Sequence, residues 1–142
     1  AIRCLKQQVP NAEVHFLTKK SFKAVTEANP YIDKFFYYDD NLNELIGYLK
    51  QEGYHYIIDL HKNFRTSIIK WRLDVPALTY DKESRQKFLL TKFGINRMRG
   101  RHISDRCVDT LKPLGVVNDE RGLDYFIPPS SKISDSDLPL SH

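Results

Sequence analysis

Length, composition and charge exclude several classes of protein. The chain has 142 residues, 41% hydrophobic and 28% charged, with 6 Gly and 7 Pro, a composition that is neither fibrous nor disordered. Its apolar runs are too short to cross a bilayer, and Cys4 and Cys107 lack the spacing of a zinc site or a disulfide framework. We therefore expect a soluble globular chain in which both cysteines are small buried hydrophobic residues.

Helical and strand periodicities alternate along the chain. The clearest helix signal is Asn41 followed three residues later by Glu44, at the start of a run of apolar residues at helical spacing. The predicted elements are a helix over 1–8, a strand over 13–18, a helix over 21–28 capped by Ser21, a strand over 32–38, a helix over 41–53, a strand over 54–60, a helix over 66–73, a strand over 76–80, and helices over 85–93 and 102–111. This alternation predicts an α/β fold, a Rossmann-like doubly wound parallel sheet with helices on both faces.

Several apolar residues are expected in the core. The run over 54–60 has a continuous apolar centre, which is typical of a strand covered on both faces. Phe22 and Val25 fall on one face of the helix predicted over 21–28. The aliphatic residues for which we expect a core role are Ile57, Ile58, Leu60, Ile103 and Leu111.

Two features bear on domain organisation. Residues 1–127 are predicted to form one incomplete Rossmann-like domain, whereas residues 128–142, rich in Pro and Ser, have the composition of a flexible linker or tail. A doubly wound domain normally opens with a strand that becomes central in the sheet, but here a helix comes first. We expect that the first strand is missing by truncation or supplied by a partner, which leaves two inner strand edges unpaired.

Positive charge is concentrated in the second half of the chain. Between Lys82 and Arg106, eight basic side chains stand against two acidic ones, a local charge of +6 in a chain of net charge +4. Such an excess attracts anionic partners, although a solvated helix face would have the same pattern. Binding of nucleic acid is the weaker hypothesis, because the stretch has no recognisable nucleic-acid motif.

The best candidate site follows the apolar strand. In open α/β sheets ligands bind beyond the carboxyl ends of strands, and the run after this strand is rich in polar groups. Its polar residues are Asp59, His61, Lys62, Asn63 and Arg65. Lysine and arginine offer charge-assisted donors to phosphate or carboxylate. Alternatively, Asp59 caps the next turn, Lys62 and Arg65 are merely exposed, and His61 is structural.

Five segments, in this order and spacing, resemble the N-terminal half of one enzyme family. They are AIRCLKQQVP (1–10), AEVHFLT (12–18), NPYID (29–33), YIIDLHKNFRT (56–66) and HISDR (102–106). They resemble the ADP-heptose:lipopolysaccharide heptosyltransferases of glycosyltransferase family 9, over about residues 1–128. The resemblance implies the N-terminal half of a GT-B fold, whose two Rossmann-like domains face a cleft.

The resemblance also implies roles for the residues. It makes this chain part of the acceptor side of a glycosyltransferase that moves heptose from ADP-heptose to the lipopolysaccharide inner core. The residues carried over as acceptor-binding are Asp59, His61, Lys62, Asn63, Arg65, Arg72, His102 and Arg106. The family's catalytic aspartate would lie in a loop before Ala1, and the ADP-heptose donor would bind a C-terminal domain. We therefore expect no catalytic residue, metal or cofactor site in this chain and no activity of the chain alone.

The implied location and partners follow from the same resemblance. A cytoplasmic protein with peripheral contact at the inner membrane of a Gram-negative bacterium is implied, and no nucleic acid is expected as a partner. The residues themselves leave a second interpretation open. Because no complete catalytic pattern is present, the alternative is a stand-alone binding module for an anionic sugar or phosphate ligand.

Overall fold

A computed structural model of the chain describes residues 1–81, 91–94 and 102–128. Helices and strands alternate as the sequence predicts. The elements are α1 (Ile2–Gln8), β1 (His15–Lys19), the 3-10 turn η1 (Lys20–Phe22), α2 (Lys23–Thr26), β2 (Lys34–Tyr38), α3 (Leu42–Gln51), β3 (Ile57–Asp59), α4 (Phe64–Leu73), β4 (Ala77–Thr79), α6 (Ile103–Asp109) and the 3-10 turn η2 (Lys112–Leu114). The predicted helix over 85–93 lies outside the described residues except for 91–93, which are helical. The predicted linker over 128–142 is outside them from residue 129 on.

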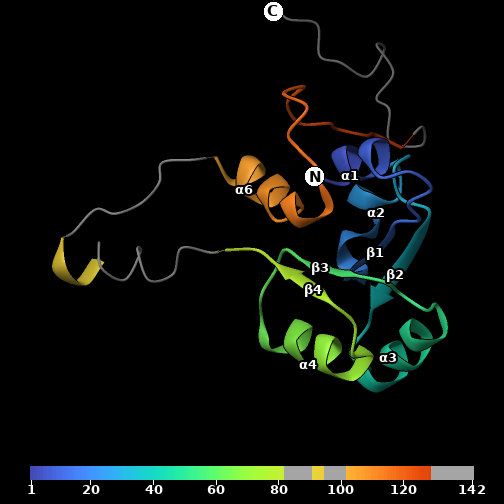
Figure 1. Cartoon of the computed structure of the whole chain (residues 1–142). Helices are drawn as coiled ribbons and strands as arrows, with labels where there is room; N and C mark the ends of the chain where they lie inside the picture. The colour runs from blue at the N-terminus through green and yellow to red at the C-terminus, as the bar shows by residue number, and fades with distance from the viewer. Residues whose placement is uncertain (82–90, 95–101, 129–142) are drawn as a thin grey trace, which may run out of the picture.

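The strands form two parallel pairs. β1 pairs with β2 from His15 opposite Lys34 to Lys19 opposite Tyr38, and β3 pairs with β4 from Ile57 opposite Ala77. Among the described residues each of the four strands has one strand neighbour, and no strand joins the two pairs. In Figure 1, α1, α2 and α6 lie on one side of the strands and α3 and α4 on the other. The chain therefore has a Rossmann-like, doubly wound α/β fold, with parallel strands between two layers of helices.

Each helix layer has its own hydrophobic core. On one side Cys4, Val108, Leu111 and Val116 are buried together, with Ile58 of β3 packed against them. On the other side four buried residues of α3 and α4 meet side chains of the first strand pair, β1 and β2. These are Leu45, Ile46, Leu49 and Ile69, packed against Leu17, Phe36 and Tyr38 among others. The second core thus holds α3 and α4 against β1 and β2, whereas β3 contributes Ile58 to the first core.

The core differs from the prediction at several positions. Leu111 is buried, but Ile103, in the first turn of α6, is 61% exposed and Val108 takes its place in the core. Ile57 and Ile58 are only half-buried, because β3 has a strand neighbour on one side alone. Cys4 is buried as expected, whereas Cys107 is half-buried, and this burial raises the pKa of its thiol.

The segment predicted as a helix over 21–28 also differs. It forms η1 followed by the short α2, and no side chain caps either of them, so Ser21 is not the cap. Phe22 and Val25 do not face the core and are 52% and 64% exposed. A single apolar pair at helical spacing is too little burial to stabilise a longer helix.

A buried ion-pair cluster fixes the last described segment onto α1. The side chain of Arg3 is 6% exposed and donates to Asp119 through Nε at 2.8 Å and to Asp124 through Nη1. It also donates to the carbonyl oxygen of Gly122 at 3.1 Å. The hydrogen bonds from Arg3, against an opposing effect of burial, hold the pKa of Asp119 well below its usual value. Residues 116–124 thus pack with α1 as part of the domain.

Candidate functional site

The carboxyl ends of the strands carry the candidate site. β1 ends at Lys19, β2 at Tyr38, β3 at Asp59 and β4 at Thr79, and within each pair the strands run parallel. Parallel strands bring the loops that follow them to one edge, where ligands of open α/β sheets bind. Of the eight residues predicted from the sequence, Asp59 ends β3, six lie after a strand or in the first turn of the next helix, and Arg72 does neither.

Asp59 shapes the loop after β3. Asp59 is 4% exposed, and its Oδ1 accepts hydrogen bonds from the backbone N–H groups of His61 at 3.0 Å and Lys62 at 2.7 Å. Its Oδ2 lies 2.7 Å from the ammonium of Lys70 on α4. Asp59 therefore caps the turn after the strand, which is the structural alternative that the sequence left open.

The loop favours the ionised form of this carboxylate. Burial opposes ionisation of Asp59, but the pairing with Lys70 and the hydrogen bonds from the backbone of Lys62 and His61 outweigh it, so the pKa of Asp59 lies below its usual value. The backbone of Lys62 has a φ of 47°, in the left-handed region that a lysine seldom adopts. The two hydrogen bonds to Asp59 hold this conformation and set the direction in which the loop leaves the strand.

Asn63 begins α4 through a capping box. Its Oδ1 accepts from the backbone N–H of Thr66 at 2.9 Å, and its own N–H donates to Thr66 Oγ1 at 3.0 Å. The helix therefore starts at Phe64, two residues earlier than predicted, because the cap is Asn63. This amide has its acceptor engaged in the helix, which leaves His61, Lys62 and Arg65 as the exposed polar side chains of the loop.

Arg65 connects the loop with the ends of the first strand pair. Its guanidinium lies 5.3 Å from the ring centre of Tyr38, at the end of β2. Together they border an open hollow of about 180 Å³ whose other lining residues are Lys19, Lys20, Ser21, Asp39 and Asp40. Sequence reasoning missed these residues, because it weighed the residues past each strand and chose only the cluster after β3.

The hollow carries charge of both signs. Lys20 Nζ lies 2.6 Å from Asp39 Oδ2, and the hydrogen bond to this carboxylate raises the pKa of Lys20. Lysine, arginine and serine donate hydrogen bonds, whereas the aspartates accept them. The lining therefore suits a ligand that combines hydroxyl groups with a carboxylate or phosphate.

His102 and Arg106 lie at the end of the other strand pair. His102 caps α6 and accepts a 3.3 Å hydrogen bond from the N–H of Ser104 through Nδ1. The guanidinium of Arg106 lies 5.0 Å from the ring centre of Tyr80 and donates to the carbonyl oxygen of Asp81. Arg106 thus holds the chain just beyond β4, whereas His102 acts as the cap of α6. The basic stretch around them, residues 82–90 and 95–101, is outside the described part of the chain.

Arg72 is set apart from the others. It lies in the last turn of α4, roughly 13 Å along the helix from Asn63 by the rise of 1.5 Å per residue. Its guanidinium lies 5.5 Å from the ring centre of Trp71. The structure therefore does not bring Arg72 to the loop that holds Lys62 and Arg65.

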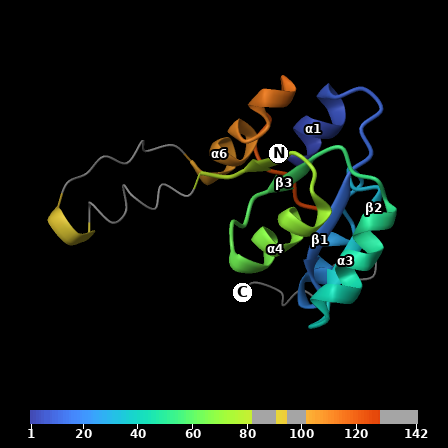
Figure 2. The same cartoon turned by 60° about the horizontal axis from the view of Figure 1, so that its bottom comes forward.

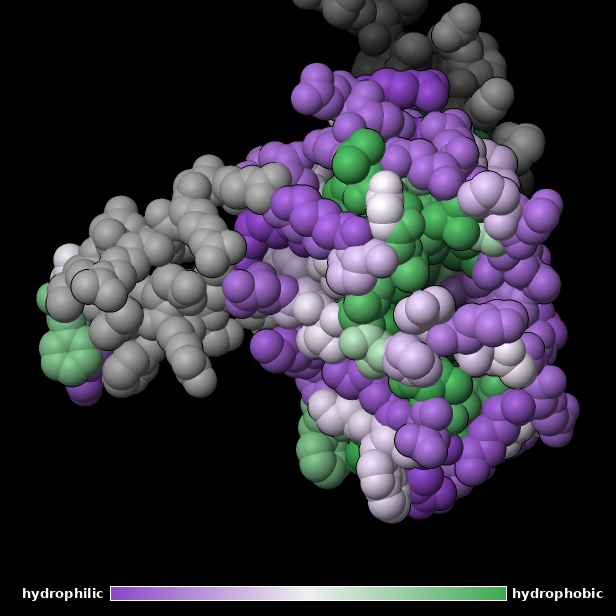
Figure 3. Space-filling view, viewed as in Figure 1, coloured by the Kyte–Doolittle hydropathy of each residue, from purple (hydrophilic) through white to green (hydrophobic). Residues whose placement is uncertain are grey.

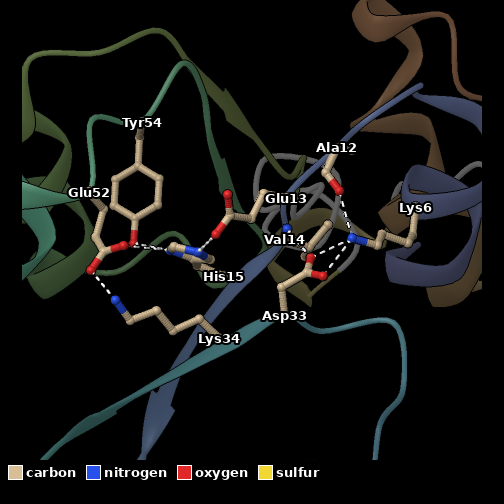
Figure 4. Close-up of polar contacts among 9 residues, drawn as sticks. All are labelled: Lys6, Ala12, Glu13, Val14, His15, Asp33, Lys34, Glu52 and Tyr54. Carbon is tan, nitrogen blue, oxygen red and sulfur yellow. Dashed lines mark hydrogen bonds and ion pairs between the residues drawn. The ribbon is translucent and has the colours of Figure 1, made fainter.

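A second polar cluster lies at the opposite edge of the strands (Figure 4). His15 is hydrogen-bonded to the hydroxyl of Tyr54 through Nδ1 and to Glu13 through Nε2, both at 2.9 Å. Lys6 donates to Asp33 at 2.7 Å, and Asp33 also accepts from the N–H of Val14. These groups precede the strands and satisfy one another, so this cluster is structural.

Two features are absent from the described residues. No group of three His, Cys, Asp or Glu there is arranged to hold a metal ion. Within the same ranges, none of the helices is long and apolar enough to cross a membrane.

Comparison with known proteins relates this fold to one family. No protein-family model and no curated protein matches the sequence. A solved structure does match, "the glycosyl transferase family 9 from Veillonella parvula DSM 2008", with a TM-score of 0.68 and 25% sequence identity. The match covers 91% of this chain and 40% of that one. In fold and sequence, the chain is thus similar to part of a glycosyltransferase of family 9.

Proposed function

We propose that this chain is the acceptor-binding part of a GT-B glycosyltransferase that transfers heptose from ADP-heptose to the inner core of lipopolysaccharide. The observation that carries the proposal is the match to a family 9 glycosyltransferase over 91% of the chain. Similarity to such an enzyme supports glycosyl transfer, and the resemblance of the five sequence segments to heptosyltransferases supplies the sugar and the acceptor.

The carboxyl edge supports a role in acceptor binding. Inner-core saccharides bear carboxylates and phosphates beside many hydroxyl groups. Arg65 and Lys62 supply cations, and the N-terminus of α4 adds the positive end of its dipole. Asp39 and Asp40 in the hollow are acceptors for sugar hydroxyls. Asp59 acts by positioning, because it holds the loop that presents Lys62.

The reaction would be a single displacement. The acceptor hydroxyl oxygen bonds to the anomeric carbon of heptose, the bond to ADP breaks, and a carboxylate takes the hydroxyl proton. The resemblance places that carboxylate before Ala1 and the donor site in a further domain. Residues of this chain would hold the acceptor so that its hydroxyl faces the donor, which is catalysis by orientation.

Replacing Arg65 tests this role. In the complete enzyme, Arg65→Ala should raise the KM for the acceptor about tenfold, the effect of losing one charge-assisted hydrogen bond, and leave the KM for ADP-heptose unchanged. Arg65→Lys should recover part of the loss, because it restores the charge without the planar fork.

Lys112→Ala is the matched control, because this side chain is 62% exposed and lies on η2, away from the strand ends that line the hollow. It should leave both KM values unchanged. Equal acceptor kinetics for Arg65→Ala and the parent enzyme would contradict the assignment of Arg65.

The second candidate function is a binding module for an anionic sugar or phosphate. It is favoured by the hollow itself, which is built from residues of this chain alone. The two functions differ in one measurement. The complete protein should release ADP from ADP-heptose in the presence of inner-core acceptor if it is a transferase, whereas a binding module would bind the acceptor without releasing ADP.

A further inference from the structure

The side chain of Lys70 on α4 connects the ends of two neighbouring strands. Its ammonium lies 2.7 Å from Oδ2 of Asp59, the last residue of β3. It also donates a 3.1 Å hydrogen bond to Oγ1 of Thr79, the last residue of β4. Only 20% of the Lys70 side chain is exposed, although a lysine loses much rotamer freedom when it is held in one place. The two contacts therefore fix this ammonium between β3 and β4.

α4 gives Lys70 a rigid base. Ile69, the residue before it, is buried in the core with α3, and Leu73 packs on the same cluster. The capping box of Asn63 fixes the first turn of the helix. In both Figure 1 and Figure 2, α4 lies on the side of β3 away from α6. Lys70 therefore reaches the two strand ends from the helix layer on that side.

The contact with Asp59 supports the loop after β3. Asp59 Oδ2 is buried and accepts no hydrogen bond of good geometry from the described residues, so the Lys70 ammonium balances its charge. The other oxygen, Oδ1, accepts from the N–H groups of His61 and Lys62. Without the ammonium, the carboxylate would either take up a proton or turn towards water. Either change weakens the hydrogen bonds that hold the loop.

The contact with Thr79 supports the chain beyond β4. Thr79 lies opposite Asp59 in the strand register, and the N–H of Tyr80 donates to the carbonyl oxygen of Asp59 at 2.9 Å. The ring of Tyr80 in turn contacts the guanidinium of Arg106. Figure 3 shows a mostly hydrophilic surface at this end of the two strands. Lys70 thus connects the predicted site residues after β3 with those beyond β4.

We propose that Lys70 is a positioning residue of the candidate site, which sets the loop of Lys62 against the segment held by Arg106. Lys70 acts through Asp59 and Thr79 rather than on the acceptor itself. The inference rests on the proposed function in one respect, because it takes the two segments to bind one acceptor. Cations on separate segments bind the charges of one saccharide only when their separation is fixed, and such fixing depends on the residues that support them.

Amide hydrogen exchange in the complete protein, resolved by residue, tests the positioning without any substrate. Lys70→Met keeps the length of the side chain and removes the ammonium. The amides of Lys62 and Tyr80 donate to Asp59 and should exchange about tenfold faster in this variant, the effect of weakening one hydrogen bond. The amide of Thr66, held by the capping box, should exchange as in the parent. Unchanged exchange at Lys62 and Tyr80, or equal acceleration at all three amides, would overturn the proposal.

Kinetics of the complete enzyme test what the positioning does. Lys70→Met should raise the KM for the acceptor about tenfold and leave the KM for ADP-heptose unchanged. Lys70→Arg keeps the positive charge and should recover part of the loss. Lys50→Met is the matched control, because Lys50 is exposed in the last turn of α3, and it should change neither KM. An acceptor KM in Lys70→Met equal to that of the parent would overturn the proposal.

A double variant separates positioning from stability. Lys70→Met alone leaves the buried carboxylate of Asp59 without its cation, so it should lower the urea midpoint. Asp59→Asn combined with Lys70→Met removes both charges and should recover most of the midpoint, because the amide oxygen still accepts from the loop. The acceptor KM of the double variant should stay raised, since the contact with Thr79 is absent. A KM that returns with the midpoint would show a role in stability alone and overturn the proposal.

The outcome is distinguishable from a failure of the proposed function, because hydrogen exchange needs neither donor nor acceptor. If exchange at Lys62 and Tyr80 accelerates in Lys70→Met but the complete protein transfers heptose to no acceptor, the proposed function fails and the positioning of the two segments stands. If transfer occurs and exchange at both amides is unchanged, the proposed function stands and the role of Lys70 is wrong.

Discussion

Charged and polar groups line both edges of the strands, but the partners and the exposure of these groups differ between the edges. At the amino edge, shown in Figure 4, His15, Tyr54 and Glu13 bond one another, and Lys6 bonds Asp33. At the carboxyl edge, the buried carboxylate of Asp59 accepts hydrogen bonds from the backbone of the loop, while the side chains of Arg65 and Lys62 are exposed. The named groups of the amino edge pair with one another, although Glu13 is 73% exposed, whereas the carboxyl edge has Lys62 and Arg65 exposed on the loop after β3.

This contrast separates polar groups that stabilise from polar groups that bind. A buried polar group whose partners are all within the chain contributes to folding and has no capacity left for a ligand. An exposed cation on a fixed loop contributes little to stability. Substitutions at the amino edge should therefore lower stability more than acceptor binding. Substitutions of exposed cations at the carboxyl edge should lower acceptor binding more than stability. Asp59 is the exception, because its substitution should lower both.

The largest effect is expected for Asp59→Ala. The change leaves the Lys70 ammonium without its carboxylate and two backbone N–H groups without an acceptor, which should lower the free energy of unfolding by about 2–4 kcal/mol. Urea unfolding followed by circular dichroism measures it. Acceptor binding should fall with it, because the loop of Lys62 loses its support. A variant as stable as the parent would contradict the structural role of this aspartate.

The pH dependence gives a second test of Asp59. Because the pKa of this carboxyl is lowered in the folded protein, its contribution to stability is present above its unfolded value of about 4 and is lost as the pH falls below that value. Asp59→Asn keeps the size of the side chain and removes the titration. The parent should therefore lose more stability between pH 5 and pH 3 than Asp59→Asn does.

Much of the fold could be predicted from the sequence, since periodicity encodes which elements form. Asn41 with Glu44 located α3, and its apolar stripe is buried. The boundary of α4 was missed because the cap of Asn63 relies on Thr66, whereas the usual signal has Glu or Gln at that position. The exposure of Ile103 was also missed. Helical spacing shows that Ile103 and Leu111 lie on one face of the helix, but it does not show which end of that face reaches the core.

The candidate site was predictable only in part. The loop after β3 was found because it follows an apolar strand directly. The hollow between Arg65 and the ends of β1 and β2 depends on which strands become neighbours, and local patterns do not contain that information. The hydrogen bond between His15 and Tyr54 at the amino edge could not be predicted for the same reason, because the two residues are 39 positions apart in the sequence.

A smaller effect is expected at the amino edge from Tyr54→Phe. The change removes the hydroxyl that bonds His15 and should cost about 1 kcal/mol of stability without any effect on acceptor binding. Burial, with added repulsion from Glu52 and Glu13, raises the pKa of Tyr54 to about 12. Because the neutral phenol is favoured in the folded state, its contribution is present below about pH 10 and declines as the pH rises towards 12. A large loss of acceptor binding in Tyr54→Phe would break the distinction between the edges.

The smallest effect on stability is expected for Lys20→Gln at the hollow. The pair of Lys20 with Asp39 is exposed, with 67% and 61% of the two side chains accessible, so the urea midpoint should not move measurably. The KM for an anionic acceptor should nevertheless rise severalfold, because one cation of the hollow is lost. Lys34→Gln is the matched control, since Lys34 also pairs with a carboxylate, that of Glu52, but at the amino edge. If both lysine variants bind acceptor like the parent, the exposed charge of the carboxyl edge has no part in acceptor binding. The two edges then differ only in how many of their polar groups are hydrogen-bonded within the chain.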